Sequence, residues 1–193
     1  MANNNRVVRS SLHRALLTAG FERYSGKFKG NQYANNKVIL DFEKVHKNKQ
    51  LYPRVLGGLC RLVAQHNPDF VVGVPDGATG YADAVARNLR IDVIHLAKDK
   101  QHHRMEFATE DDRVLADLLQ RGVLIEDVPN RRTSLKEAVD LLGAKVIRAV
   151  GIFDRGVPGE LIDIGIGVDS LVHEPIPAEL SQRHELWHFA RGK

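Results

Sequence analysis

The sequence predicts an α/β fold with a doubly wound, mostly parallel sheet. Short apolar runs that are typical of buried strands, over residues 70–74, 91–96, 123–125 and 145–153, alternate with helical segments between residues 51 and 155. The runs at 70–74 and 123–125 each continue into a polar loop and then a helix. Ligands of open α/β sheets bind outside the carboxyl ends of the strands, so these two loops are the first candidates for a site.

Composition limits the functional classes. A chain of 193 residues with 43% hydrophobic and 27% charged residues suits one soluble domain with a real core. The net charge of +4 fits an anionic ligand, but the basic residues are spread rather than gathered in a stripe, which disfavours nucleic acid as a partner. No apolar run approaches the roughly 20 residues of a membrane span, and the first residues lack a signal-peptide core, so the expected location is the cytoplasm.

The first part of the chain lies outside the strand–helix alternation. Residues 10–19 predict a helix that stops at Gly20, and residues 37–42 a short strand. Between them, residues 21–33 suggest an extended segment and a turn whose lysines, Lys27 and Lys29, either meet an anion or are simply solvated. We expect residues 1–45 to form a small N-terminal cap over the crevice, 46–175 the α/β core and 176–193 a helical tail.

The middle of the chain contains the first strand–loop–helix unit. A helix over residues 51–66 has Gly57 and Gly58 in its middle, which either weaken it or permit close packing, and a single cysteine, Cys60, expected to be a buried structural thiol. After the strand at 70–74, glycines in the loop 75–80 would let backbone N–H groups approach a diphosphate, with Asp76 placed to help a metal. The loop matches neither a Walker motif nor GxGxxG, which disfavours nucleoside triphosphates and dinucleotides.

A basic segment follows the strand at 91–96. Residues 97–104 carry lysines, histidines and an arginine with few apolar anchors, so we expect an exposed, mobile loop. It is either a basic lid over an anionic substrate or a solvated loop. Its two adjacent histidines lack the further ligands of a metal site.

Residues 121–142 hold the main candidate site. The run 123–125 ends at two carboxylates, Glu126 and Asp127, which could accept hydrogen bonds from vicinal ribose hydroxyls, directly or through a metal. The loop 129–133 then leads into a helix whose N-terminal end suits a phosphate, and Arg131, Arg132, Thr133 and Ser134 add donors. Ser134 and Glu137 have the spacing of a capping box, so the helix is predicted to start at Ser134. The alternative is an ordinary strand–turn–helix with a solvated acidic end.

The last strands complete the sheet. The run 145–153 ends at Asp154, Arg155 and Gly156, and residues 161–172 predict one or two further short strands.

Five segments, in this order, resemble the type I phosphoribosyltransferases, and among them the orotate phosphoribosyltransferases. Residues 123–138 resemble the family's signature for 5-phosphoribosyl-1-diphosphate (PRPP), and residues 72–82 its diphosphate loop. Residues 21–29 resemble the N-terminal segment of the orotate enzymes, residues 98–102 the mobile catalytic loop, and residues 153–155 the strand end whose arginine faces the base.

The resemblance implies transfer of ribose 5-phosphate from PRPP to a nucleobase, most readily orotate, in a homodimer that uses Mg²⁺. Glu126 and Asp127 would hold the ribose hydroxyls, with Asp127 a candidate ligand for the Mg²⁺ that PRPP brings. The remaining implied contacts are Thr133 and Ser134 to the 5-phosphate; Asp76, Gly77 and Ala78 to the diphosphate; Lys98, Lys100 and His102 in the closing loop; and Lys27 or Lys29 with Arg155 at the base.

The chain departs from the family in the phosphate loop. Compact hydroxyl residues and a glycine are replaced by Pro129, Asn130, Arg131 and Arg132. The arginines either bind the phosphate through their side chains or fill its pocket. Two functions therefore remain open: a transferase with a rebuilt loop, or a phosphoribosyltransferase-fold protein without transferase activity that senses a nucleotide or PRPP.

Overall fold

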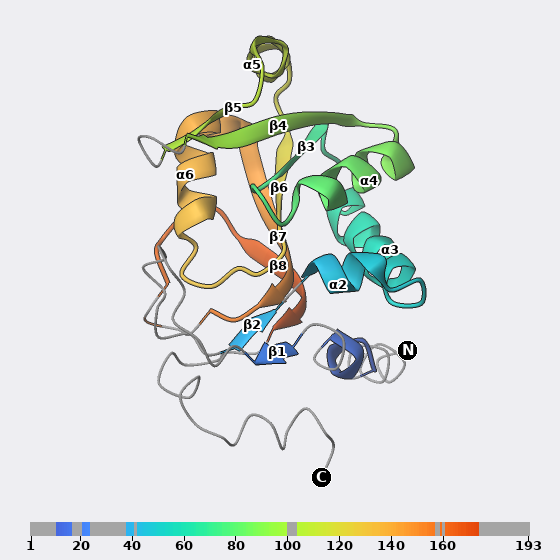
Figure 1. The fold of residues 1–193 in the computed structure, drawn as a ribbon. Helices are drawn as coiled ribbons and strands as arrows, with labels where there is room; N and C mark the ends of the chain where they lie inside the picture. Colours follow the sequence, from blue (N-terminus) through green and yellow to red (C-terminus); the bar gives the residue numbers. More distant parts are fainter. Residues whose placement is uncertain are drawn as a thin grey trace.

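A six-stranded sheet forms the centre of the computed structural model, which describes residues 11–16, 21–23, 38–40, 42–99, 104–156, 159 and 161–173 (Figure 1). The strand order is β5-β4-β3-β6-β7-β8; β5 is antiparallel to β4, and the other neighbours are parallel. The strands are β3 (Phe70–Gly73), β4 (Asp92–Asp99), β5 (Arg104–Phe107), β6 (Gly122–Glu126), β7 (Val146–Asp154) and β8 (Val168–His173). The predicted fold class is confirmed.

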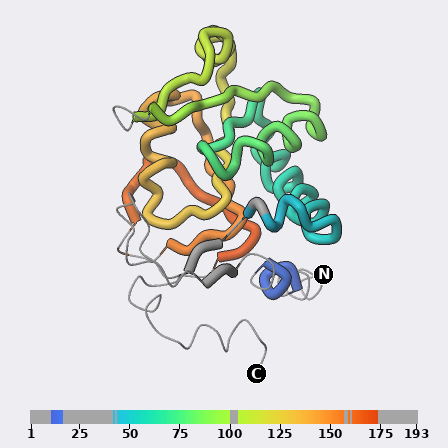
Figure 2. The backbone as a smooth tube through the Cα atoms, viewed as in Figure 1, coloured from blue at the N-terminus to red at the C-terminus, as the bar shows by residue number. Residues whose placement is uncertain are grey.

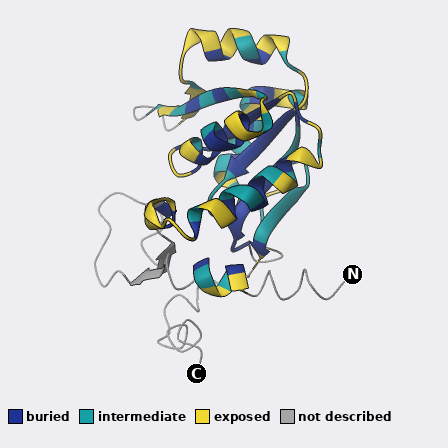
Figure 3. Ribbon diagram, turned by 90° about the vertical axis from the view of Figure 1, so that its right-hand side faces the viewer, coloured by how far each residue is buried: buried dark blue, intermediate teal, exposed yellow. Residues whose placement is uncertain are grey.

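Helices cover both faces of this sheet (Figure 1). One face packs against α2 (Phe42–Lys47), α3 (Tyr52–Ala64) and α4 (Thr79–Leu89), and the other against α5 (Glu110–Leu118) and α6 (Thr133–Leu142), which a short 3-10 turn, η1 (Gly143–Lys145), follows. Alternate strand residues serve the two cores: Val71 and Val123 join the first, Val72 and Leu124 the second. The strands in the middle of the sheet are accordingly buried on both sides (Figure 3).

The beginning of the chain contributes to the first core. Residues 11–16 are helical, and their Leu12 and Leu16 pack in the same buried cluster as Phe42 and Val45. Strands β1 (Phe21–Arg23) and β2 (Val38–Leu40) pair antiparallel in a separate two-stranded sheet. That this part caps the crevice stays a prediction, and the expected tail at 176–193 lies outside the described residues.

The expected mobile loop at 97–104 is partly wrong. Residues 97–99 extend β4, and they pair with a strand that the sequence analysis missed, β5, in the register Lys98↔Met105. The apolar anchors come just after the basic run: Met105 is buried in the second core, and Phe107 packs against it. These anchors hold the returning strand and thereby order the end of β4.

The predicted capping box is also wrong. Helix α6 starts at Thr133, and its N-cap is Arg132 in the left-handed conformation, with φ of 68° and no capping hydrogen bond from a side chain. The carbonyl of Arg132 accepts the first helical hydrogen bond, from the N–H of Lys136, at 2.9 Å. The left-handed turn at Arg132 brings the chain into the helix before Ser134 is reached, so Ser134 lies inside the first turn.

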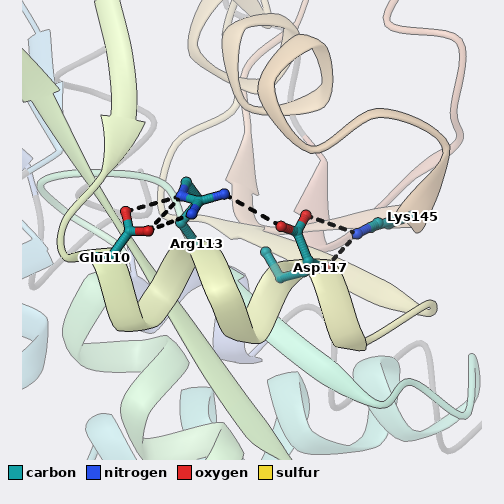
Figure 4. Close-up of polar contacts among 5 residues, drawn as sticks. Glu110, Arg113, Asp117 and Lys145 are labelled. Carbon is teal, nitrogen blue, oxygen red and sulfur yellow. Dashed lines mark hydrogen bonds and ion pairs between the residues drawn. The ribbon is translucent and has the colours of Figure 1, made fainter.

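Helix α5 stands at the edge of the molecule and is largely exposed (Figure 3). The Thr109 hydroxyl caps it by accepting a hydrogen bond from the N–H of Asp112 at 3.1 Å. Along its surface Arg113 pairs with Glu110 and Asp117, and the Lys145 ammonium donates to the Ala116 carbonyl (Figure 4). Exposed pairs of this kind contribute little individually, so α5 depends mainly on its cap and on Ala116 in the second core.

The two glycines of α3 have different surroundings. A Cβ at Gly57 would meet only Arg61 Nη1 at 3.7 Å, whereas a Cβ at Gly58 would lie 2.8 Å from Leu171 Cδ2 of β8. We expect Gly57→Ala to raise the free energy of unfolding by about 0.5–1 kcal/mol, because alanine is the better helix former. Gly58→Ala should be about 1–2 kcal/mol less stable than Gly57→Ala, because its methyl group displaces Leu171. Urea titration of both variants measures this order, and equal stabilities would contradict it.

The order of the strands places a crevice between two particular loops. From β3 the chain crosses to β4 on one side, and it later returns to β6 on the other side of β3. The loops that leave the carboxyl ends of β3 and β6 therefore diverge, and they open the crevice at which ligands of such sheets bind.

Candidate functional site

The loop after β3 is in contact with the acidic pair at the end of β6, Glu126 and Asp127. A Cβ atom at Gly77 would lie only 2.1 Å from Asp127 Oδ2, so the glycine backbone packs directly against this carboxylate. The N–H of Val74 donates to the Ile125 carbonyl at 2.8 Å and thereby joins the two strand ends. Asp76 and Gly77 are exposed and Ala78 is buried. The structure thus brings the predicted diphosphate loop and the predicted ribose carboxylate together.

Burial dominates the electrostatics of the acidic pair. Burial, with the nearby Asp127 charge, raises the pKa of Glu126 to about 8, and Glu126 Oε2 is covered without a hydrogen-bond partner among the described residues. Burial also raises the pKa of Asp127, whose Oδ1 accepts a hydrogen bond from the Val128 N–H at 2.9 Å. The Lys98 charge acts in the opposite direction and lowers the pKa of both carboxyls. The exposed Lys98 side chain of β4 therefore lies within electrostatic reach of the pair.

The loop between β6 and α6 runs beside the end of β7 (Figure 2). Two hydrogen bonds join them: the Asp127 carbonyl accepts from the Phe153 N–H at 3.0 Å, and the Pro129 carbonyl accepts from the Arg155 N–H at 2.8 Å. Pro129 is buried over Gly151, where a Cβ atom would come within 2.6 Å of Pro129 Cγ. Pro129 therefore packs against β7 at this position, and the loop bonds to the residues at the end of β7 through its carbonyls, which a proline retains.

The four predicted phosphate contacts gather around the start of α6. Arg131 and Thr133 are exposed, and Arg132 and Ser134 are half-buried. The first turn of α6 holds no acidic residue and has no side-chain cap, so its N–H groups and the helix dipole leave a positive end at the crevice. This end can attract an anion.

A second charged group lies at the ends of β7 and β8. Asp154, paired with His173 in the strand register, is 3% exposed, and its Oδ2 lies 3.7 Å from Arg132 Nη2 and 3.4 Å from His173 Nδ1. Sequence analysis gave no role to Asp154 or His173, although both follow apolar runs. The neighbouring Arg155 is 5% exposed, and burial lowers the pKa of its guanidinium.

Several predicted residues cannot be placed in this site. Lys27, Lys29, Lys100 and His102 lie outside the described residues. Within the described part of the chain, no three His, Cys, Asp or Glu side chains are grouped as a ready metal site. In the same part, no helix has the length and apolar character needed to cross a membrane. Cys60 is a free, half-buried thiol beside the first core.

Comparison with known proteins relates this geometry to one fold. No family model and no curated protein sequence matches the chain. Solved structures do match it. The orotate phosphoribosyltransferase from Aeropyrum pernix aligns over 86% of this chain and 93% of its own, with a TM-score of 0.60 and 20% identity.

Two further matches carry different base names. The adenine phosphoribosyltransferase from Rhodothermus marinus covers 88% of this chain and 99% of its own, with a TM-score of 0.63 and 12% identity. The orotate phosphoribosyltransferase from Mycobacterium tuberculosis, in complex with inorganic phosphate, covers 86% and 96%, with a TM-score of 0.60 and 15% identity. The orotate and adenine enzymes match this chain with similar TM-scores, so the fold does not indicate which base is used. What these structures show is that the chain has the phosphoribosyltransferase fold.

Proposed function

We propose that this protein transfers ribose 5-phosphate from PRPP to a nucleobase and releases diphosphate, with orotate the first acceptor to try. One observation carries the proposal: at the switch point of the sheet, the loop of Asp76 and Gly77 packs on the Asp127 carboxylate, beside the uncapped start of α6. A ribose that carries a phosphate at one end and a diphosphate at the other needs such a set of groups.

The chemistry divides the site into three parts. Glu126 and Asp127 would accept hydrogen bonds from the ribose hydroxyls, while the first turn of α6 and Arg132 would hold the 5-phosphate. As the bond to the sugar breaks, negative charge grows on the departing diphosphate. Lys98, already within reach of the acidic pair, would help to neutralise this charge. The further contacts in this proposal are Gly77 and Ala78 to the diphosphate, Arg131, Thr133 and Ser134 to the phosphate, Lys100 and His102 in the closing loop, and Lys27 or Lys29 with Arg155 at the base.

A magnesium ion fits this arrangement as a companion of the substrate. Mg²⁺ usually keeps several waters and takes one or two carboxylates plus substrate phosphates, so it needs no dedicated cage of side chains. The half-buried Asp127 carboxylate beside Gly77 offers one such ligand, and Asp76 lies exposed next to Gly77 in the loop after β3. The ion would offset charge on the diphosphate. A homodimer in the cytoplasm belongs to the same proposal.

The direct test mixes the protein with PRPP, Mg²⁺ and a panel of bases and measures diphosphate release. Release that depends on one base supports the transferase. If PRPP neither reacts with the protein nor binds to it, the proposal is overturned.

A second candidate is a ligand sensor without transferase activity. The rebuilt loop favours it, since Pro129 is committed to packing on Gly151 and Arg132 already contacts Asp154. In the same experiment the sensor would release no diphosphate with any base, yet PRPP would raise its melting temperature.

Arginine variants test the phosphate part of the site. We expect Arg132→Ala to weaken ribose 5-phosphate binding by roughly tenfold or more, because a half-buried guanidinium at a helix start contributes a charge-assisted hydrogen bond. Arg131→Ala removes an exposed side chain of equal charge and should weaken binding less, by roughly two- to threefold. Calorimetric titration of both variants measures the difference. Unchanged affinity in Arg132→Ala would mean that its guanidinium does not meet the phosphate.

A further inference from the structure

The His95 ring of β4 lies between carboxylates from two helices. β4 runs between α4 and α5 (Figure 1). From α4, Asp83 Oδ1 lies 2.8 Å from His95 Nε2. From α5, Asp112 Oδ1 lies 3.4 Å from His95 Nδ1. Each ring nitrogen therefore faces a carboxylate oxygen, and only the protonated ring carries an N–H group on both nitrogens.

Asp112 also completes the backbone hydrogen bonding of β4. The N–H of Ala108 donates to the His95 carbonyl at 2.9 Å, but the chain then turns into α5, and the His95 N–H donates to Asp112 Oδ1 at 2.8 Å. The other oxygen, Oδ2, accepts a hydrogen bond from the Thr109 hydroxyl at 2.5 Å. Asp112 is 8% exposed, and through these bonds it joins the start of α5 to β4.

The charged surroundings of the ring come from these two helices. The neighbouring strand β3 presents Gly73 in register with His95, and the segment after β5 meets His95 through a backbone N–H. The hydrogen bond to Asp83 raises the pKa of His95 by more than burial lowers it, and the charges of Asp83 and Asp112 raise it further. Burial acts to raise the pKa of Asp112, but hydrogen bonds from Thr109 and His95 lower it overall. His95 is therefore the member of this cluster that changes its charge near neutral pH.

We propose that the protonated His95 ring joins α5 to α4, and that loss of its proton loosens the start of α5, which makes this contact a pH-sensitive switch. The distances decide which helix is loosened. A neutral ring keeps one N–H group, and the closer contact, of 2.8 Å to Asp83, retains it. The unprotonated Nδ1 then directs its lone pair towards Asp112 Oδ1, and the two repel each other. This inference does not depend on the proposed transfer reaction.

The contact stabilises α5 at neutral and mildly acidic pH. The pKa of His95 is higher in the folded protein than in the unfolded chain. Its stabilising effect is therefore complete below about pH 6.5 and is lost as the pH rises through the folded-state pKa. Because the buried residues of α5 are only Asp112 itself and Ala116, loss of the contact should appear as local opening of this helix.

Ring titration and hydrogen exchange of the same protein test the switch. By NMR, the His95 signal, identified by its absence in His95→Gln, should titrate above about pH 6.5. Between about pH 6 and pH 9, the protection of α5 amides, corrected for intrinsic exchange, should fall roughly two- to fivefold more than the protection of β3 amides. The β3 amides report the loss of global stability that ionisation of Glu126, with its pKa of about 8, causes in the same range. In His95→Gln the excess loss in α5 should be absent.

Asp83→Asn checks the mechanism even if His95→Gln does not fold. Asparagine removes the charge that supports the protonated ring, so the His95 titration and the loss of α5 protection should move to lower pH together. His66→Gln is the matched control, since its ring pairs with a single carboxylate, Asp169 of β8, at 3.0 Å. This control should keep the wild-type pH dependence of α5.

Three results would overturn the inference. In the wild type, α5 protection could follow β3 protection at every pH. The excess loss could persist in His95→Gln. In Asp83→Asn, the midpoint of the α5 loss could stay in place while the His95 titration moves. None of these results bears on diphosphate release, so the switch and the proposed transferase are tested separately.

Discussion

Replacing Asp127 by asparagine is expected to reduce diphosphate release from PRPP by roughly a hundred- to a thousandfold. The amide keeps the shape and can still accept the hydrogen bond from the Val128 N–H, but it loses the negative charge that would hold the ribose hydroxyls and Mg²⁺. Because burial raises the pKa of the Asp127 carboxyl, removing its charge should not lower the melting temperature. Steady-state kinetics and thermal unfolding of the same preparation measure both effects.

Asp92→Asn is the matched control for this variant. Asp92 is exposed at the opposite, amino-terminal end of β4, where it pairs in register with Phe70. It carries the same change of charge far from the crevice, so turnover should stay within roughly twofold of the wild type. Equal losses in the two variants would show that Asp127 acts only through the overall charge of the protein.

Glu126→Gln is expected to stabilise the protein at neutral and alkaline pH. In the folded state burial raises the pKa of Glu126 to about 8, whereas in the unfolded chain this carboxyl ionises above about pH 4.5. Between these values the unfolded state binds fewer protons, so wild-type stability falls as the pH rises. Glutamine does not titrate, and the variant should therefore gain roughly 2–4 kcal/mol by pH 8 and nothing below pH ~4.5.

Urea unfolding at a series of pH values measures this gain. Glu110→Gln provides the control with the opposite sign. The hydrogen bond from Arg113 lowers the pKa of the exposed Glu110 carboxyl (Figure 4). The ionised Glu110 side chain therefore stabilises the protein slightly at neutral pH, and this stabilisation disappears on acidification. A Glu126→Gln protein whose stability parallels the wild type from pH 5 to 8 would show that Glu126 is ionised in the folded state.

The sequence predicted the elements whose burial is nearly complete. β3 and β6 are apolar on both faces, and each stops at a polar loop, so their positions and the crevice between them could be anticipated. The end of β4 could not, because Lys98 and Asp99 are polar and are held in the sheet by β5, whose anchors Met105 and Phe107 come later in the chain. Tertiary pairing there overrides the local composition.

The candidate site was predicted unevenly for a related reason. Glu126 and Asp127 follow a clear strand, and the loop containing Gly77 was recognisable by its glycines. The start of α6 was misplaced because the Ser134 spacing indicates a capping box, whereas the left-handed Arg132 begins the helix earlier. The contacts of Asp154 could not be predicted, because Arg132 and His173 lie far from it in sequence, one before and one after. Folding brings them together at the carboxyl ends of β7 and β8.

The packing of Pro129 on Gly151 has a consequence for how this crevice can change. The proline ring fills the space that a side chain at residue 151 would need, so the loop and the strand are sterically complementary at this point. Exchanging Pro129 for a small hydroxyl residue would leave a hollow above β7, and enlarging Gly151 would lift the loop from the sheet. A route from this loop to one that binds phosphate through its backbone therefore passes through paired substitutions at 129 and 151.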